Sequence, residues 1–393
     1  MEYQILKRPP RRKRNVWIAV ALVLMAAVAA GGYLVSRDVR TSRAAGPGPV
    51  AGAGTSTTTP VGARPMTVVS TVPATGAMGV PSDQVVSVTF SRPVAGTIGV
   101  PVFSPPVPGV WRHAGPDAIT FVATAPFVPT TTETLTVPGG PAGVRGVDGT
   151  ALGTPVTVVF GVAQASTERL QQLLAVLDYL PVSFTTSGPA PAPVEEATSQ
   201  PGAFSWRWPG LPTDFTSLWT EGVENVITKG ALMSFQSQHG LPVDGLAGRQ
   251  VWTALLSDAA ATRADSAPYT DVLVSKQVPQ TLTLYENGNP VMANVAVNTG
   301  APGADTADGT FPVFEHVPSS RMQGTNPDGT TYDDPAVPWA SYFNGGDALH
   351  GFVRATYGSP QSNGCVEMPV AVAAQVWPLT PVGTPVTVTG PPS

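Results

Sequence analysis

The 393-residue sequence has few charged side chains, four histidines and a single cysteine. Charged residues make up 12% of the chain, against roughly a quarter in an average soluble domain. One cysteine excludes an internal disulfide framework, and four scattered histidines with one cysteine do not provide the ligand spacing of a zinc site. No glycine-rich phosphate loop lies between a strand and a helix. We therefore expect no metal, no cofactor and no nucleotide chemistry.

Proline and glycine are abundant instead, with 43 and 41 residues that make up about a fifth of the chain. This composition favours short strands and many turns over long helices. The chain is also too long for one ordinary hydrophobic core. We therefore predict a multidomain, mainly β protein.

The N-terminus combines a basic run with an uncharged stretch. Residues 1–15 contain one acidic residue, Glu2, against six cationic ones: Lys7, Arg8, Arg11, Arg12, Lys13 and Arg14. Residues 16–35 carry no charge and have about the length that spans a bilayer, which favours a membrane over a nucleic-acid partner. The stretch exceeds the roughly 7–15 apolar residues of a signal peptide. We expect a retained transmembrane helix, with a cleaved signal peptide as the alternative.

The positive-inside rule then makes residues 1–15 a cytoplasmic tail and places the rest of the chain outside. The expected location is the bacterial cell membrane, single-pass, with the C-terminal part on the extracytoplasmic face. Residues 36–66 consist mostly of Ala, Gly, Pro, Ser and Thr, which cannot bury enough apolar surface to fold. They form a predicted flexible linker with a reach of roughly 30 Å.

Residues 67–163 contain short alternating or β-branched runs separated by Gly, Pro and Asp. Five runs are predicted as strands: 67–70, 84–90, 118–123, 134–137 and 155–160. They imply a β-sandwich, and the string "VVSTVPATGAMGVPSDQVVSVTFSRPV" resembles bacterial Ig-like domains. Because no catalytic residue types cluster here, we interpret this domain as a spacer.

Residues 165–258 change to a helical period. Four leucines follow the spacing of one helix face: Leu170, Leu173, Leu174 and Leu177. An insertion at 184–210 precedes a second helix near 229–239. The string "GLPVDGLAGRQVWTALL" then resembles the peptidoglycan-binding domain 1 family in five residues: Gly240, Asp244, Gly245, Gly248 and Trp252. The resemblance implies a small helical domain whose residues act mainly as scaffold, with glycan or stem-peptide contact left open.

Residues 271–390 return to strand patterns. Asn287-Gly288 lies between two apolar runs and predicts a hairpin with a type I′ turn. The stretch 319–369 is interpreted as loop-rich. This third domain is therefore predicted to be mostly β, with its chemistry in long loops.

The only cysteine, Cys365, lies fifteen residues after His350. A lone cysteine is often a small buried apolar residue. An imidazole beside a thiol, however, lowers its pKa and accepts its proton, so the pair predicts a nucleophile and a general base.

The stretch 271–389 resembles the catalytic domain of L,D-transpeptidases of the YkuD type. The resemblance rests on the His350-Gly351 pair, followed by Ser362-Asn363-Gly364-Cys365 and an apolar residue. Two positions depart from the family pattern. Asn363 replaces the usual histidine before Gly-Cys, and Glu367 replaces the usual Arg or Asn two residues after the cysteine.

The resemblance implies an acyl transfer on peptidoglycan stem peptides. Cys365 would form a thioester with the third stem residue, and a neighbouring amine would resolve it into a 3→3 cross-link. His350 would be the base, with the Gly351 carbonyl fixing its tautomer. The oxyanion is expected near Asn363, Gly364 and Cys365, while Ser362 either orients the loop or is an ordinary turn residue.

Weaker candidates for substrate contact are Tyr342, Arg354 and Tyr357, and a lid is expected to contain Arg321, Trp339, Tyr342 and Phe343. Two other functions remain open: a catalytically impaired wall-binding protein, and an L,D-carboxypeptidase in which water resolves the thioester. The sequence does not indicate an oligomeric state.

Overall fold

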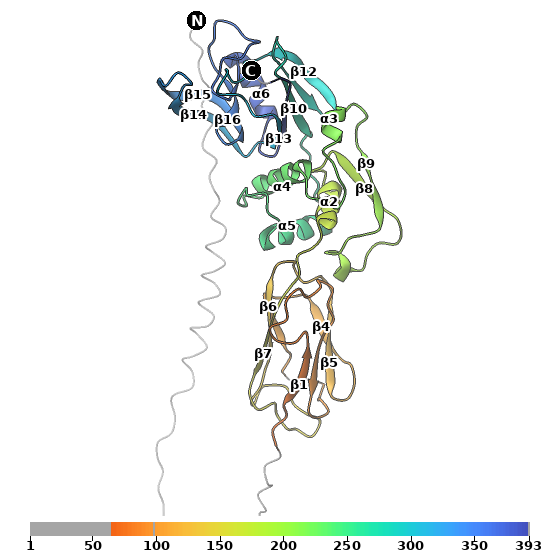
Figure 1. Cartoon of the computed structure of the whole chain (residues 1–393). Coiled ribbons are helices and arrows are strands. Elements are labelled where there is room, and N and C mark those ends of the chain that lie inside the picture. The colour runs from red at the N-terminus through yellow and green to blue at the C-terminus, as the bar shows by residue number, and fades with distance from the viewer. Residues whose placement is uncertain (1–63, 97–98, 392–393) are drawn as a thin grey trace, which may run out of the picture. The chain divides into compact units, whose positions relative to one another are not determined.

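The computed structural model describes residues 64–96 and 99–391 (Figure 1), which belong to one compact unit. The predicted tail, transmembrane helix 16–35 and most of the linker lie outside the described residues. Within 64–96 and 99–391, no helix is long and apolar enough to cross a membrane.

The N-terminal domain is a β-sandwich of two antiparallel sheets. One sheet has the strand order β1 (Val68–Val72), β2 (Val86–Phe90), β5 (Ala118–Ala123) and β4 (Gly109–His113). The other has the order β3 (Val102–Ser104), β6 (Thr132–Val137) and β7 (Val156–Gly161). Alternate side chains such as Val86, Val88 and Phe90 are buried between the sheets, as the period-2 pattern requires. The expected runs are strands, and β3 and β4 are two further strands.

The middle domain contains the three helices α2 (Thr167–Val176), α4 (Val226–Gln238) and α5 (Arg249–Ala260), and the short α3 (Thr213–Thr216). The hydroxyl of Ser166 caps α2 by accepting from Arg169 N, and the amide oxygen of Asn225 caps α4. Their apolar faces share a core that includes Leu173, Phe235 and Trp252. The predicted insertion is largely an antiparallel hairpin of β8 (Val182–Thr186) and β9 (Gly202–Trp206), with the 3₁₀ turn η1 (Pro193–Glu195) between them.

The C-terminal domain is built on two sheets. The first has the order β12 (Asn289–Ala296), β11 (Thr281–Glu286), β10 (Thr270–Ser275), β18 (Pro385–Thr389) and β13 (Gly309–Pro312). Asn287 and Gly288 join β11 to β12 with φ angles of 51° and 72°, as the predicted type I′ turn requires.

The second sheet of this domain provides the scaffold of the site. Its order is β14 (Glu315–Thr325), β15 (Thr331–Asn344), β16 (Asp347–Gly351) and β17 (Val366–Met368). The helix α6 (Val370–Val376) and the turn η2 (Trp377–Leu379) follow β17. Buried residues of both sheets and of α6 form one hydrophobic core.

The prediction that residues 319–369 are rich in loops is wrong for the first half of this stretch, because β14 and β15 form a long hairpin there. The hairpin is hard to recognise from sequence, since most of β14 is exposed and shows no apolar alternation. Pro335 and Pro338 also weaken the strand pattern of β15. The long connection that remains in this stretch is 352–365, from β16 to β17.

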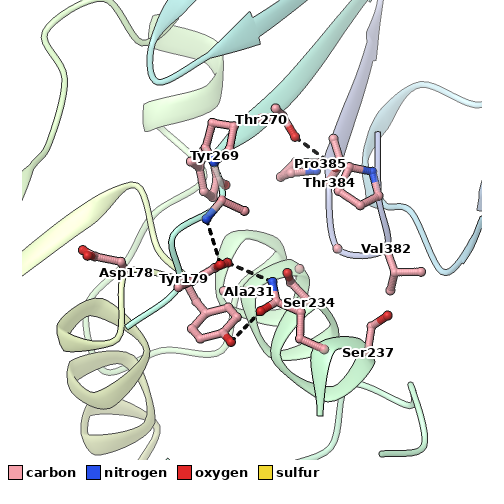
Figure 2. A pocket seen from close by; sticks show the side chains of 17 residues that line it. Asp178, Tyr179, Ala231, Ser234, Ser237, Tyr269, Thr270, Val382, Thr384 and Pro385 are labelled. Atoms are coloured by element: carbon pink, nitrogen blue, oxygen red, sulfur yellow. Dashed lines mark hydrogen bonds between the residues drawn. The ribbon is translucent and has the colours of Figure 1, made fainter. Parts of the chain in front are cut away.

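A small cavity of about 100 Å³ lies where α4 meets the segment before β18 (Figure 2). Tyr179, Ser234 and Tyr269 are among its lining residues. Gly230 packs closely here, because a Cβ at this position would lie 2.5 Å from the carbonyl oxygen of Gly383. Neither cysteine nor histidine lines this cavity.

Candidate active site

Cys365 and His350 line the same cleft, which has a volume of about 460 Å³. One wall comes from the β14–β15 hairpin and the other from β16, β17 and the connection between them. A larger cleft of about 720 Å³ lies among Pro105, Glu133 and Arg249, but neither cysteine nor histidine lines it. The smaller cleft is therefore the candidate active site.

His350 is held on β16, opposite Glu367 of the parallel strand β17. Only 3% of the residue is exposed. Its Nδ1 lies 3.1 Å from the carbonyl oxygen of Gly351. Because a carbonyl only accepts, Nδ1 carries the hydrogen and Nε2 keeps a free lone pair. Burial lowers the pKa of His350, which the Gly351 hydrogen bond and the charge of Glu367 partly oppose.

Cys365 immediately precedes β17, and its thiol lies 3.6 Å from the carbonyl oxygen of Gly346. Burial raises the pKa of the thiol to about 12, while a hydrogen bond from the backbone of Ala348 acts in the opposite direction. The negative charges of Asp347 and Glu367 raise this pKa further. The prediction of a lowered thiol pKa is therefore wrong, because burial and the nearby acidic charges outweigh the hydrogen bond from Ala348. The resting pair is a thiol with a neutral imidazole.

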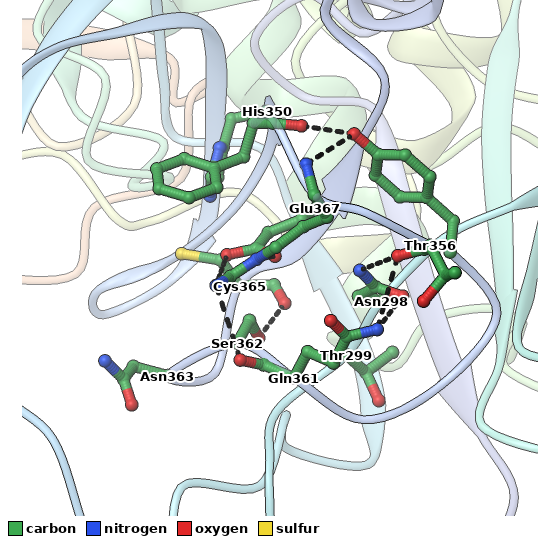
Figure 3. Close-up of polar contacts among 12 residues, drawn as sticks. Asn298, Thr299, His350, Thr356, Gln361, Ser362, Asn363, Cys365 and Glu367 are labelled. Atoms are coloured by element: carbon green, nitrogen blue, oxygen red, sulfur yellow. Dashed lines mark hydrogen bonds and ion pairs between the residues drawn. The ribbon is translucent and has the colours of Figure 1, made fainter.

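The turn before the cysteine is tightly fixed (Figure 3). The buried hydroxyl of Ser362 donates to the carbonyl oxygen of Cys365 at 2.5 Å, so Ser362 orients this turn. Gly364 has a φ angle of +103°, and a Cβ there would lie 2.4 Å from Oδ1 of Asp347. The hydroxyl of Thr306 donates to the carbonyl oxygen of Gly364 at 2.7 Å. Glycine is thus required at 364 both by its backbone conformation and by the available space.

The connection between the His350-Gly351 pair and the Ser362–Cys365 segment is fixed by the fully buried Asn298 (Figure 3). Its Nδ2 donates to the carbonyl oxygen of Thr356, and its Oδ1 accepts from the backbone of Gly358. Its own backbone pairs in both directions with Glu367. Asn298 therefore connects the loop to the strand that follows the nucleophile.

Two of the weaker substrate-contact candidates are occupied by internal contacts. Arg354 lines the cleft, but its guanidinium is paired with both carboxylate oxygens of Glu367. The hydroxyl of Tyr357 donates to the carbonyl oxygen of Phe352, and the side chain does not line the cleft. Substrate contact by Tyr357 therefore stays a prediction. Tyr342 does line the cleft, where its hydroxyl lies 2.8 Å from that of Ser320.

The predicted lid residues separate in the structure. Arg321 lies on the cleft wall of β14, paired with Asp333. Phe343 belongs to the core, being 3% exposed, and Trp339 packs against that core. The lid prediction is therefore wrong for these two aromatic residues, because Phe343 is buried in the interior of the domain and Trp339 packs against its core.

Sequence reasoning missed several residues that line the cleft: Asn326, Tyr332 and Asp334 of the β14–β15 hairpin, and Asp347 at the start of β16. Burial raises the pKa of Tyr332. Asn363 is exposed, and its Nδ2 donates to Oδ1 of Asn326 at 2.6 Å. No linear spacing links these residues to Cys365, because an unrecognised strand pairing positions them.

Within residues 64–96 and 99–391, no group of three or more His, Cys, Asp or Glu side chains is arranged to hold a metal ion. The site chemistry described here rests on the cysteine, the histidine and the surrounding backbone.

Comparison with known families matches three parts of the chain to domain models. Residues 270–388 match the model of the L,D-transpeptidase catalytic domain, YkuD. Residues 62–162 match a bacterial Ig-like domain, and residues 219–255 match a putative peptidoglycan binding domain. No curated protein matches the chain.

Three solved structures illustrate the similarity. L,D-transpeptidase 3 from Mycobacterium tuberculosis is 14% identical, with 82% of this chain and 98% of that chain covered and a TM-score of 0.29. An L,D-transpeptidase from Mycobacterium smegmatis is also 14% identical, with 83% and 100% covered and a TM-score of 0.28. The catalytic domain of an E. faecium L,D-transpeptidase is 25% identical, with 32% and 100% covered and a TM-score of 0.28.

The family models thus identify a catalytic domain, an all-β domain and a helical domain in one chain. This protein contains an L,D-transpeptidase catalytic domain of the YkuD family together with a bacterial Ig-like domain and a peptidoglycan-binding domain of type 1.

Proposed function

We propose that this protein is a peptidoglycan L,D-transpeptidase that forms 3→3 cross-links through a thioester on Cys365. The observation that carries the proposal is the shared cleft of Cys365 and a neutral, tautomer-fixed His350 within the L,D-transpeptidase catalytic domain. Peptidoglycan is the substrate that this domain and the peptidoglycan-binding domain have in common.

In the first step, Nε2 of His350 takes the thiol proton as the sulfur attacks the carbonyl carbon of the third stem residue. The raised thiol pKa makes proton removal concurrent with attack, since little free thiolate exists at neutral pH. The carbon–nitrogen bond to the terminal D-alanine breaks, and its amine receives the proton from His350. The product of this step is a thioester between Cys365 and the stem peptide.

The developing oxyanion needs donors that are in place before the reaction. The backbone N–H groups of Asn363, Gly364 and Cys365 are the proposed donors, supported by the rigid turn in which they lie. Ser362 and Thr306 hold this turn from opposite ends through the carbonyl oxygens of Cys365 and Gly364. These two hydroxyls are positioning groups, because they contact the loop rather than the substrate.

In the second step, an amine of a neighbouring stem peptide attacks the thioester carbonyl. The carbon–sulfur bond breaks, an amide bond forms, and the amine proton passes through His350 to the sulfur. If water takes the place of the amine, the product is a shortened stem peptide with a free carboxylate. The same acyl-enzyme therefore supports either cross-linking or L,D-carboxypeptidase activity.

Intact-mass analysis of the protein incubated with a disaccharide-tetrapeptide tests the proposal. We expect an acyl adduct on Cys365, release of D-alanine and a cross-linked dimer, all absent from Cys365→Ser. A carbapenem serves as a second acylating probe. Failure of both probes to modify Cys365 would leave wall binding without turnover as the better description.

We also propose that residues 16–35 retain the protein in the bacterial cell membrane, with the catalytic domain on the extracytoplasmic face. The proposal rests on the twenty uncharged residues that follow the basic N-terminus. Fractionation should recover the full-length chain with membranes, and protease added to spheroplasts should digest the catalytic domain. A soluble form with a new N-terminus near residue 45 would instead indicate a cleaved signal peptide.

A further inference from the structure

The outer part of the β14–β15 hairpin, residues 319–336, is hydrogen-bonded to Asn363 in the connection 352–365 that contains Cys365. The Nδ2 of Asn363 donates to Oδ1 of Asn326 at 2.6 Å, and both residues line the cleft. Among the described residues, this is the only hydrogen bond that links 319–336 to 345–368. The base of the hairpin pairs with β16 in the same sheet, whereas its outer part reaches the opposite wall through this one side-chain hydrogen bond beside the nucleophile.

The hairpin end that makes this contact is itself well ordered by hydrogen bonds. The backbone N–H of Asn326 donates to the carbonyl oxygen of Thr330 at 2.7 Å, and its Nδ2 donates to the Thr330 hydroxyl at 2.9 Å. That hydroxyl in turn donates to Oδ1 of Asp328 at 2.6 Å. The side chain of Asn326 therefore presents its oxygen to Asn363 from a fixed position.

Asn363 is suited to this contact because its amide supplies an N–H while the residue itself is exposed. The hydrogen bond also involves one of the two positions at which the chain departs from the family pattern. The residue at 363 therefore links the turn that holds Cys365 to the hairpin that forms the opposite wall of the cleft.

We propose that Asn326 is a specificity-determining residue, which holds the hairpin across the cleft through Asn363 and thereby favours an amine over water as the acceptor of the acyl group. The inference rests on the proposed acyl-enzyme. Once the thioester exists, a hairpin held against Asn363 limits the entry of bulk water, whereas an acceptor peptide can occupy the remaining length of the cleft. Loss of the contact opens this end of the cleft to hydrolysis.

The experiment measures how the acyl-enzyme of the full-length protein divides between two products. The protein is incubated with a disaccharide-tetrapeptide, and the cross-linked dimer and the hydrolysed disaccharide-tripeptide are quantified by mass spectrometry. Acylation of Cys365 by a carbapenem is followed separately, because it reports the first step and the integrity of the site.

Three substitutions distinguish loss of the Asn326–Asn363 hydrogen bond from a general loss of order in the hairpin. Asn326→Ala removes the acceptor, whereas Asn326→Asp keeps an oxygen for Asn363. Asp328→Ala is the matched control, because it removes hydrogen bonds to Thr330 in the same turn and contacts neither Asn326 nor Asn363.

We expect Asn326→Ala to lower the dimer-to-tripeptide ratio about threefold to tenfold, the change that one neutral hydrogen bond makes in an open–closed equilibrium. Its carbapenem acylation should stay within about twofold of the unsubstituted protein, and both Asn326→Asp and Asp328→Ala should keep the original product ratio.

An unchanged ratio in Asn326→Ala overturns the inference, and so does an equal fall in Asp328→Ala. Hydrolysis as the only outcome in the unsubstituted protein also overturns it. The proposed function fails separately, if Cys365 forms no acyl-enzyme with either probe.

Discussion

Arg354 holds Glu367 through a two-point contact, with Nε 2.7 Å from Oε2 and Nη2 2.8 Å from Oε1. Glu367 is 4% exposed and lies beside His350 in the parallel pair of β16 and β17. The contact raises the pKa of Arg354 and keeps a buried carboxylate paired next to the proposed base. The acidic residue two positions after the nucleophile is therefore part of the internal framework of the site.

Removing Arg354 should destabilise the protein because it leaves this carboxylate buried without its cation. For Arg354→Met we expect the free energy of unfolding to fall by about 2–4 kcal/mol, less than for a fully buried pair because water partly screens Arg354. Chemical denaturation measures the change. Arg354→Met/Glu367→Met should recover most of the loss, and additive losses in the double variant would contradict the pairing argument.

The acylation rate should depend on pH through His350, which must be neutral to accept the thiol proton. Because burial lowers the pKa of His350, the rate should fall only when the pH drops below the ordinary histidine value of about 6.5. The rate of carbapenem adduct formation between pH 5 and 9 measures this. An inflection at or above that value would contradict a buried neutral base. In His350→Ala the acid inflection should be absent and the rate lower by about 10² or more.

Cys365 should react slowly with a simple alkylating agent. Its thiol pKa of about 12 leaves little thiolate at pH 8, so we expect iodoacetamide to modify it more than about tenfold slower than N-acetylcysteine. Intact-mass time courses give both rates. Because the thiolate fraction increases with pH, the rate should still be rising at pH 10. Faster alkylation than the free thiol would instead show an activated thiolate.

Thr306 should matter for acylation although it does not line the cleft. Its buried hydroxyl donates to the carbonyl oxygen of Gly364 and accepts from the backbone N–H of Gly300 at 2.9 Å. Thr306→Val removes both contacts, and we expect acylation to slow about tenfold to hundredfold through displacement of the turn. Carbapenem adduct formation measures the rate, and circular dichroism checks the fold.

The matched control for Thr306 is Thr310→Val. The hydroxyl of Thr310 contacts Thr387 between β13 and β18, away from the turn. Equal slowing in both variants would show a general effect on stability rather than positioning of Gly364.

The sequence by itself determined the local features of this protein. Asn287-Gly288 predicted its turn because two successive positive φ angles strongly favour this dipeptide. The leucine spacing predicted the face of α2, and alternating apolar residues predicted the strands of the sandwich. The family pattern around Cys365 predicted the type of catalytic domain. Each of these signals depends only on residues close together in the chain. Short-range sterics and periodicity can therefore be recognised from the sequence without knowledge of the fold.

Only the tertiary structure decided how the site is assembled. The β14–β15 hairpin is held by backbone pairing with few buried side chains, so its sequence carries little strand signal, yet it brings Asn326 and Tyr332 to the cleft. The pairing of Arg354 with Glu367 depends on how the connection after β16 folds back on β17. The thiol pKa follows from burial and from nearby carboxylates, which sequence spacing does not encode. These properties depend on distance in space and on exclusion of water, and both arise only when the distant segments pack together.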